Sequence, residues 1–582
     1  MNAWEAYLVC RRVAVLDQAP GGGIYRINTE DATAASMAED CQLAVPMKDS
    51  KDVPLILRWW QSIAWQRLMA MLAGAAAFAL VLVITDPPGP GLDPDALAYM
   101  GAAESVAAHA EYRIPMATWA SADSTSALAH FPPGYPTVLA IPVRLGMPAA
   151  QGARLVEAVA AFVTITTLVL LVGAAASVGV GLLLALVLVA MTSMQEVHVS
   201  VLSEPLYLAC MTLVLAAMVL APERPLYAAI PAAAGFMTRY AGASLVGAAA
   251  LWALLQPGRW RVRVRRAVVA LLPALVLQGV WVVRTRRAAG PGEIRKFALY
   301  GDLGPTFREG GRTLAAWLIP DAGADHDPLS HRPALALAAG IALAVLVAIG
   351  VWRAWRATPR AGDHAEILDA SPSGDGDANA LVAWRLFTAA ALLLLCYAGI
   401  VGVSRVVADP RIPLDERILA PALLLLTTSA ATGLSLWWRG TRLHIARVTV
   451  AVGLLAWGYA AVQATRVKAH WALSWGSDFA GEQWRESEVL AWARTDGARS
   501  PLYSNWPAAV YFHLHRPSRE LPRTSDARTM AAFADTVRVR GGRVLLFNAR
   551  STELAPNDSV AKARGLHEIE RLRDGVVLGP EP

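Results

Sequence analysis

The sequence is poor in charge and in cysteine. Charged side chains make up 17% of its 582 residues and hydrophobic ones 55%, a composition far from that of a water-soluble enzyme. The four cysteines are scattered and form no CxxC pair, so neither a disulfide framework nor a cysteine metal site is predicted: Cys10, Cys41, Cys210 and Cys396. The chain also shows no repeat of fixed period and no signal-peptide core before its first long hydrophobic run.

Long hydrophobic runs are what the sequence has in abundance. Nearly uncharged segments of roughly 18 or more residues recur, which is the length a helix needs to cross a bilayer. We predict a mainly α, polytopic transmembrane helical bundle of about eleven spans, drawn at 68–85, 153–175, 177–194, 204–221, 226–239, 241–256, 267–283, 332–352, 383–403, 418–437 and 446–464. The alternative for the two short segments around Arg239 is one long tilted helix.

The net charge of +6 is unevenly distributed. Arginines cluster in the connections 257–266, 353–382 and 438–445, as the positive-inside rule predicts for cytoplasmic loops. This pattern accounts for the basic balance without a nucleic-acid partner. With a cytoplasmic amino terminus, it places the first loop, 86–152, and everything after 465 on the outer side.

The sequence predicts three regions. Residues 1–55 are expected to form a polar, flexible leader, and Met47 and Met69 are alternative starts. A transmembrane domain should span 56–464. Residues 465–582 should form a small extracytoplasmic α/β domain, because a helical pattern at Glu488–Ala493 is followed by the apolar run Val544–Phe547.

Three acids stand near the outer ends of predicted spans. Asp93 and Asp95 follow the first span, and Asp93-Pro94 is a natural cap for a helix that begins there. A carboxylate at a helix start stays ionised, as a general base requires. Glu204, in Ser203-Glu204-Pro205, opens a later span. For the two aspartates the alternative is an ordinary solvated loop, and for Glu204 it is a role in starting the helix.

Other polar residues are expected on the same face. Tyr99 follows Asp95 on the predicted helix, and His130 begins a Pro-Pro-Gly turn. His198 lies near Glu196, and a metal site there competes with a purely structural role. Three cations and one adjoining tyrosine are expected on the outer face: Arg239, Tyr240, Arg284 and Arg417. They suggest a phosphate ligand. The alternative is contact with lipid headgroups or pairing with Asp415 or Glu416.

Taken together, these motifs resemble those of the GT-C superfamily of integral-membrane glycosyltransferases, similar to bacterial aminoarabinose transferases and protein O-mannosyltransferases. The resemblance covers about residues 55–525 and is carried by Asp95-Ala-Leu-Ala-Tyr99, His130-Phe-Pro-Pro-Gly-Tyr-Pro136, Ser203-Glu-Pro-Leu206, Thr238-Arg-Tyr-Ala-Gly242, Arg284, Asp415-Glu-Arg417 with Pro421, and Tyr503-Ser-Asn-Trp-Pro507. Relatives often carry Asp-Glu where this chain has Asp95-Ala96, and many have a lysine in place of His130.

The resemblance implies a hexosyl- or pentosyltransferase of a bacterial inner membrane. It implies a polyprenyl-phosphate-linked sugar as donor and a glycolipid, glycan or protein acceptor on the periplasmic side. Membrane lipids are the other expected partners. It also implies that Asp95 is the base, and it leaves open whether a divalent metal takes part. An oligosaccharide ligase and a polytopic lipid or solute transporter are the alternatives.

Overall fold

The computed structural model describes residues 53–288, 304–320, 332–357, 375–407, 412–497, 499–549 and 554–580. The chain divides into two compact units, Met1–Trp65 and Gln66–Pro582, and the second carries every feature discussed below. The expected leader, 1–55, lies almost wholly outside the described residues.

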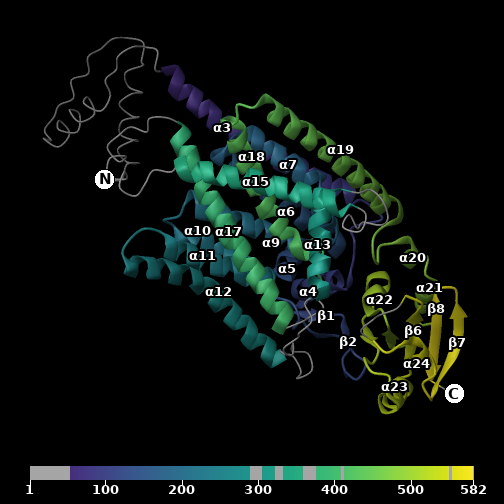
Figure 1. The fold of residues 1–582 in the computed structure, drawn as a ribbon. Helices are drawn as coiled ribbons and strands as arrows, with labels where there is room; N and C mark the ends of the chain where they lie inside the picture. Colours follow the sequence, from purple (N-terminus) through teal and green to yellow (C-terminus); the bar gives the residue numbers. More distant parts are fainter. Residues whose placement is uncertain are drawn as a thin grey trace, which may run out of the picture. The chain divides into compact units, whose positions relative to one another are not determined.

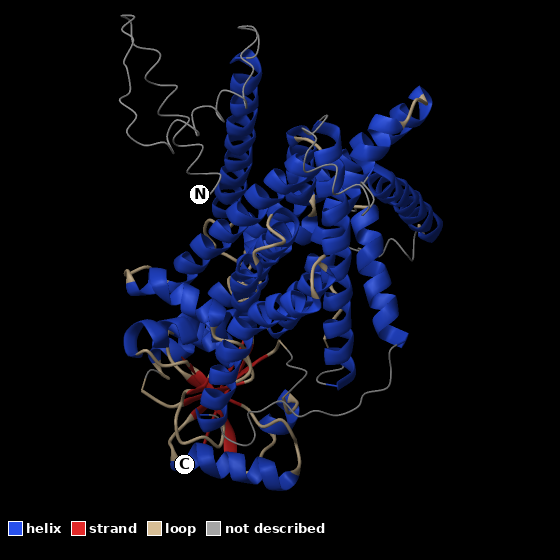
Figure 2. Ribbon diagram, turned by 90° about the vertical axis from the view of Figure 1, so that its left-hand side faces the viewer, coloured by secondary structure: helices blue, strands red, loops and turns tan. Residues whose placement is uncertain are grey.

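Helices dominate the part of the chain that is described (Figures 1 and 2). The helices up to Leu255 are α3 (Val53–Ile84), α4 (Pro94–His109), α5 (Gly134–Arg144), α6 (Ala149–Ala175), α7 (Val178–Ala190), α8 (Thr192–Val199), α9 (Glu204–Leu220), α10 (Pro225–Thr238), the 3₁₀ turn η1 (Tyr240–Gly242) and α11 (Ala243–Leu255). The later long helices are α12 (Trp260–Ala288), α13 (Gly304–Leu318), α15 (Pro333–Ala357), α17 (Asp375–Val407), α18 (Glu416–Gly440) and α19 (His444–Trp475).

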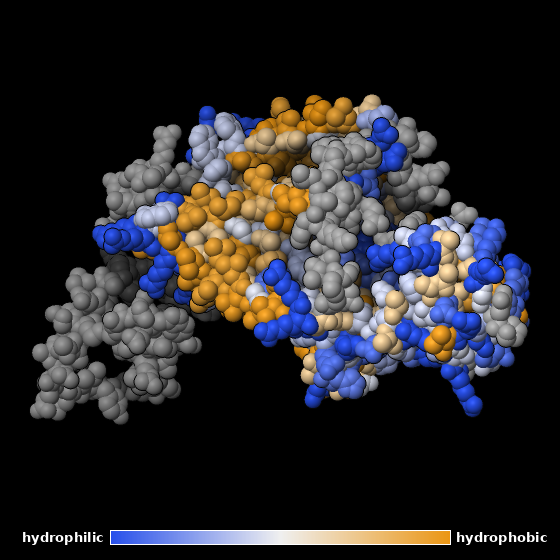
Figure 3. Space-filling view, turned by 90° about the horizontal axis from the view of Figure 1, so that it is seen from below, coloured by the Kyte–Doolittle hydropathy of each residue, from blue (hydrophilic) through white to orange (hydrophobic). Residues whose placement is uncertain are grey.

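The predicted spans fall on helices, with 177–194 covering the two helices α7 and α8, but the predicted count of about eleven is higher than the structure supports. By length and composition, seven helices in the described ranges can cross a bilayer, or eight if α7 and α8, bent by 69°, form one span. The helices α9 and η1–α11 are apolar but shorter. One face of the molecule shows hydrophobic residues over the helical part and hydrophilic ones over the carboxyl-terminal part (Figure 3). The chain is therefore a multi-pass membrane protein, as its composition predicts.

The segment around Arg239 contains two helices instead of one long helix. Thr238 ends α10, and Arg239 has an extended backbone (φ −144°, ψ 142°) before η1 begins. A side chain on Gly242 would meet the Phe236 backbone at 2.4 Å, so the turn requires glycine there. The break places Arg239 at a helix end.

The carboxyl-terminal region adds a sheet to the helical bundle. Its strands are β4 (Leu502–Ser504), β5 (Ser518–Glu520), β6 (Arg543–Phe547), β7 (Leu566–Leu572) and β8 (Gly575–Pro580), and its helices are α20 (Glu482–Arg485), α21 (Glu488–Thr495), α22 (Pro507–Leu514), α23 (Ala527–Val539) and α24 (Asn557–Ala561). The predicted helix and apolar run correspond to α21 and β6. Alternate residues of β6 enter two hydrophobic cores, Val544 and Leu546 in one and Leu545 and Phe547 in the other.

The first loop supplies one strand of this sheet. The strand order is β2-β5-β4-β6-β8-β7, where β2 (Met116–Thr118) comes from the first loop and pairs in parallel with β5, Met116 opposite Ser518. The strands β1 (Arg113–Ile114) and β3 (Ser126–Ala127) form a separate antiparallel pair. The loop that follows the first span is thus part of the carboxyl-terminal sheet.

The boundary expected at 464 falls inside a helix. Because no glycine or proline interrupts the chain between Thr465 and Trp475, α19 continues to Trp475 and ends at Gly476, whose φ is +76°. After that turn Phe479 donates a backbone hydrogen bond to Leu92, just before α4.

Candidate active site

The start of the first loop is fixed by backbone contacts on two sides. Gly91 forms a bridge with Ser200, at the end of α8, and Leu92 forms one with Asp478. These bridges bring the first turn of α4 close to the start of α9. As predicted, Asp93 caps α4, its Oδ1 accepting a hydrogen bond from the Ala96 amide at 2.8 Å, and Pro94 takes the first helical position.

Arg417, from the first turn of α18, joins three carboxylates. Its Nη1 lies 2.7 Å from Asp93 Oδ2, its Nη2 lies 3.2 Å from Asp95 Oδ2, and its Nε lies 3.2 Å from Glu204 Oε1. All three nitrogens of the guanidinium are therefore engaged by acids. The alternative partners, Asp415 and Glu416, make no ion pair with Arg417 in the described structure.

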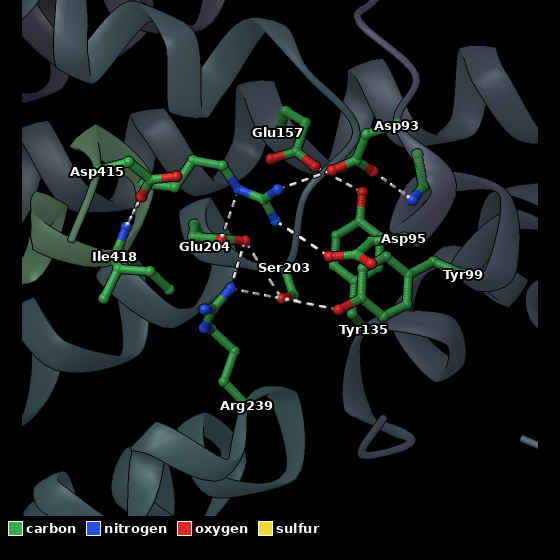
Figure 4. A network of polar contacts seen from close by, with 12 residues as sticks. Asp93, Asp95, Tyr99, Tyr135, Glu157, Ser203, Glu204, Arg239, Asp415 and Ile418 are labelled. Carbon is green, nitrogen blue, oxygen red and sulfur yellow. Dashed lines mark hydrogen bonds and ion pairs between the residues drawn. The ribbon is translucent and has the colours of Figure 1, made fainter. Parts of the chain in front are cut away.

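Arg239 approaches Glu204 from the other side (Figure 4). Its Nη1 lies 2.5 Å from Glu204 Oε2 and 3.1 Å from Ser203 Oγ. Ser203 precedes α9 but makes no capping bond, because its hydroxyl faces Arg239 and, at 3.2 Å, the Tyr99 hydroxyl. Glu204 is buried, with a side chain 3% exposed, and each of its carboxylate oxygens pairs with a guanidinium. These ion pairs offset the cost of burying its charge.

The cluster holds one more acid than base. Asp93, Asp95 and Glu204 face two guanidiniums. Burial raises the pKa of Asp93 to about 7, with the Asp95 carboxylate adding to the shift and Arg417 opposing it. A proton on Asp93 would balance the charges of the cluster, and near pH 7 the cluster exchanges that proton.

Aromatic rings pack against the acids. Tyr99 contacts Phe131 and Tyr135 edge to face, with ring centroids 4.9 and 5.1 Å away. Burial, and next the Asp95 charge, raise the pKa of Tyr99, so its hydroxyl stays protonated. Tyr135 donates to Glu157 on α6 at 2.5 Å. These contacts fix the face of α4 that presents Asp95.

The Pro-Pro-Gly turn brings His130 to the same place. A side chain on Gly134 would meet the Met237 carbonyl oxygen at 2.5 Å, so glycine permits α5 to begin directly against the end of α10. His130 stacks edge to face on Phe131, 4.9 Å between centroids. The turn thereby lies beside Arg239.

These residues surround a cavity of about 290 Å³. Polar side chains from five parts of the chain line it: Asp95, Tyr99, His130, Ser203, Thr238, Arg239, Tyr240, Tyr397, Ser404, Asp415 and Arg417. Apolar residues of α17 and of the segment before α18 complete the wall, among them Ile400, Val401 and Pro413. An ionisable rim with an apolar wall suits a ligand that has a charged head and a hydrocarbon tail.

Asp93, Glu204, Arg284 and His198 lie outside that lining, for different reasons. Asp93 is paired with Arg417, and Glu204 is paired with Arg239. Arg284 donates to the carbonyls of Leu128 and Tyr112 at 3.0 and 2.8 Å and stacks on two aromatic rings, so it braces the first loop. His198 is buried in a separate cavity beside α3.

Several lining residues were not among the predicted site residues, and Tyr397 and Asp415 are the two with ionisable side chains. Tyr397, from α17, donates from its hydroxyl to the Ile418 carbonyl at 2.5 Å. Asp415 caps α18 through its Oδ1, 2.9 Å from the Ile418 amide, and burial raises its pKa. The Asp-Glu-Arg sequence signalled Asp415, whereas nothing local distinguished Tyr397 within its apolar span.

Metal ligands are not grouped in the described ranges. No set of three or more His, Cys, Asp or Glu side chains there is arranged to hold an ion. The acids of the cluster instead pair with guanidiniums.

Comparison with known proteins gives structural matches alone. No family model and no curated protein matches the chain. It is similar to ArnT from Cupriavidus metallidurans bound to undecaprenyl phosphate (TM-score 0.43, 15% identity, covering 87% of this chain and 97% of that one). It is also similar to the Archaeoglobus fulgidus oligosaccharyltransferase in complex with Zn and sulfate (TM-score 0.46, 11% identity, 82% and 68%). With TM-scores below 0.5 and identities of 15% and 11%, these matches leave the function to be argued from the site.

Proposed function

We propose that the chain is a membrane glycosyltransferase of the GT-C type, which transfers a sugar from a polyprenyl-phosphate-linked donor to an acceptor on the periplasmic side of a bacterial inner membrane. The observation that carries the proposal is the cavity that Asp95, Arg239 and Arg417 share with apolar residues of α17. A carboxylate supplies a base, a guanidinium supplies a phosphate ligand, and the apolar wall accommodates the start of a prenyl chain.

The two arginines have different parts in this proposal. Arg417 uses Nε, Nη1 and Nη2 on carboxylates, so it organises the acids. The bonds of Arg239 to Glu204 and Ser203 both use Nη1, and its Nε and Nη2 make no hydrogen bond within the described structure. Those two donors can bind the donor phosphate and stabilise the charge that develops on it as it leaves.

Asp95 is the proposed base. Its side chain is 38% exposed and lines the cavity, whereas Asp93 caps a helix and Glu204 is buried between guanidiniums. The acceptor oxygen or nitrogen attacks the anomeric carbon while its proton passes to Asp95. The bond from that carbon to the phosphate oxygen breaks, and polyprenyl phosphate leaves with both bonding electrons. A direct displacement of this kind inverts the anomeric centre.

The test is Asp95→Asn in cells that lack the chromosomal gene. Mass spectrometry of cell-envelope glycolipids and glycans should find a product one sugar heavier with the wild type, and at least 100-fold less of it with Asp95→Asn. Asp123→Asn is the matched control, because Asp123 is a well-exposed acid of the same loop and should preserve the product. A folded Asp95→Asn variant that makes normal product would remove Asp95 from the proposed role.

A further inference from the structure

A second cavity lies between α3, α6, α7 and α8 and shares no lining residue with the first. Its volume is about 50 Å³, and its wall is mostly aliphatic, with contributions such as Val81, Ile165 and Leu188. Three polar side chains lie in this wall, and Gln195 is paired with the Val189 carbonyl. Thr164 and His198 are 2% and 8% exposed, and neither Thr164 Oγ1 nor His198 Nε2 has a hydrogen-bond partner among the described residues.

The hydrogen-bonding capacity of these two atoms can be assigned. His198 Nδ1 lies 2.8 Å from the Met194 carbonyl oxygen. Because a carbonyl only accepts, Nδ1 carries the proton, and in the neutral ring Nε2 is then an acceptor. Thr164 Oγ1 can donate or accept. The pair therefore calls for a group that donates to His198 and accepts from Thr164, which a hydroxyl does and an ester or ether oxygen does not.

We propose that this cavity binds the hydroxyl end of a lipid alcohol. Water also has the right donor and acceptor, but one water requires only ~10–15 Å³ and two to four polar partners. A single water would satisfy both atoms and leave most of the aliphatic cavity empty. Of the other lining side chains only Gln195 is polar, and its Nε2 already donates to the Val189 carbonyl at 3.1 Å. A hydroxyl that carries methylene groups satisfies the two polar atoms and fills the apolar remainder.

The rest of such a lipid has a place to lie. Val83 on α3 and Leu186 on α7 are each 62% exposed, on helices that line the cavity. An alkyl chain leaving the cavity can continue against these membrane-facing side chains. Since no cavity residue belongs to the cluster around Arg417, the lipid alcohol is bound as a ligand and does not react. The proposal is independent of the glycosyltransferase assignment.

Photolabelling of the full-length protein in nanodiscs tests the site. The probes are a long-chain 1-alkanol bearing a diazirine and its methyl ether, with the labelled peptides identified by mass spectrometry. The alcohol should label peptides of α3, α6 and α8 about fivefold more than the ether, because the ether lacks the donor for His198. Thr164→Val, which keeps the shape of the side chain, should weaken labelling by both probes, because an alcohol and an ether both accept from the Thr164 hydroxyl, and Thr164→Ser, which keeps the hydroxyl, should preserve the labelling.

His198→Phe provides a second test that does not depend on Thr164. It replaces the imidazole by an apolar ring and should abolish the preference for the alcohol. Equal labelling of the wild type by alcohol and ether would overturn the proposal and leave water as the occupant. A preference that survives in the folded His198→Phe variant would also overturn it, by placing the alcohol elsewhere.

Discussion

At the scale of single residues, the site is a charge balance in which each group has a separate task. Arg239 keeps two nitrogens for a ligand, whereas Arg284, equally basic and also on the first-loop side, is occupied by the carbonyls of Tyr112 and Leu128. This difference permits the proposed phosphate ligand to be tested against a matched cation of the same chain.

We predict that Arg239→Gln weakens the binding of undecaprenyl phosphate by at least tenfold, because it removes a charge-assisted contact worth about 1.5–3 kcal/mol. Arg284→Gln should leave the affinity within about twofold. Binding to the purified proteins can be measured by scintillation proximity with a labelled ligand. Equal loss in the two variants would indicate a general effect of positive charge in place of a specific site.

The shifted pKa of Asp93 gives a second prediction at this scale. With that pKa near 7, Asp93 is mostly neutral at pH 6 and mostly ionised at pH 8, where it adds a negative charge beside the proposed phosphate site. A phosphodiester remains a monoanion throughout this range. The KM for the donor should therefore be roughly tenfold lower at pH 6 than at pH 8, as expected for one charge roughly 6 Å away at an effective dielectric near 40.

Asp93→Asn separates this effect from other titrations. Asparagine keeps the helix cap but cannot ionise, so the variant should show the low KM of pH 6 at both pH values. Asp415, whose pKa is also raised by burial, lines the cavity as well. A pH dependence that is unchanged in Asp93→Asn would assign the effect to Asp415 or to another group.

At the scale of elements, the sequence predicts what is local. Hydrophobic runs locate the helices, and the caps Asp93-Pro94 and the start at Ser203-Glu204 follow from short motifs. The pairing of Arg417 with Asp93 joins residues 324 apart in the chain, and no local pattern specifies it. The same is true of β2, whose three residues show no strand signal and become a strand only by pairing with β5. Non-local contacts are thus what the sequence leaves open.

The first loop and the carboxyl-terminal sheet should move as one element. Arg519 donates to the carbonyls of Ser121 and Ala122 at 3.3 and 2.8 Å, and Arg540 donates to Ser121 at 2.7 Å. We predict that the double variant Arg519→Gln, Arg540→Gln raises hydrogen exchange in 116–122 by about two orders of magnitude, since the three lost bonds cost about 1 kcal/mol each.

Arg538→Gln is the control for this experiment. Arg538 lies in the last turn of α23, just before Arg540. It is exposed, and it pairs with Asp535 of the same helix. Its replacement should leave exchange in 116–122 unchanged, because exposed pairs contribute little. Unchanged exchange in the double variant would mean that β2 alone holds the loop to the sheet.

At the scale of the whole molecule, the helices carry arginine at the ends remote from the site. α18 begins beside Arg417, and its 25 residues extend about 37 Å, enough to cross a hydrocarbon core of ~30 Å. At its far end Arg353 of α15 donates to the carbonyls of Leu436 and Trp437. α12 reaches the first loop near Arg284 and starts with an arginine cluster at its other end (Figure 1). These ends meet the positive-inside rule if the site faces the periplasm.

This orientation can be measured with single cysteines in a variant that lacks the four native ones. Ser525→Cys and Arg261→Cys introduce exposed thiols in the carboxyl-terminal region and at the basic end of α12. A membrane-impermeant maleimide should label Ser525→Cys in intact spheroplasts, and it should label Arg261→Cys only after lysis, because the two positions lie on opposite sides. The reverse pattern would place the carboxylates and the cavity on the cytoplasmic face, where a periplasmic transfer reaction cannot take place.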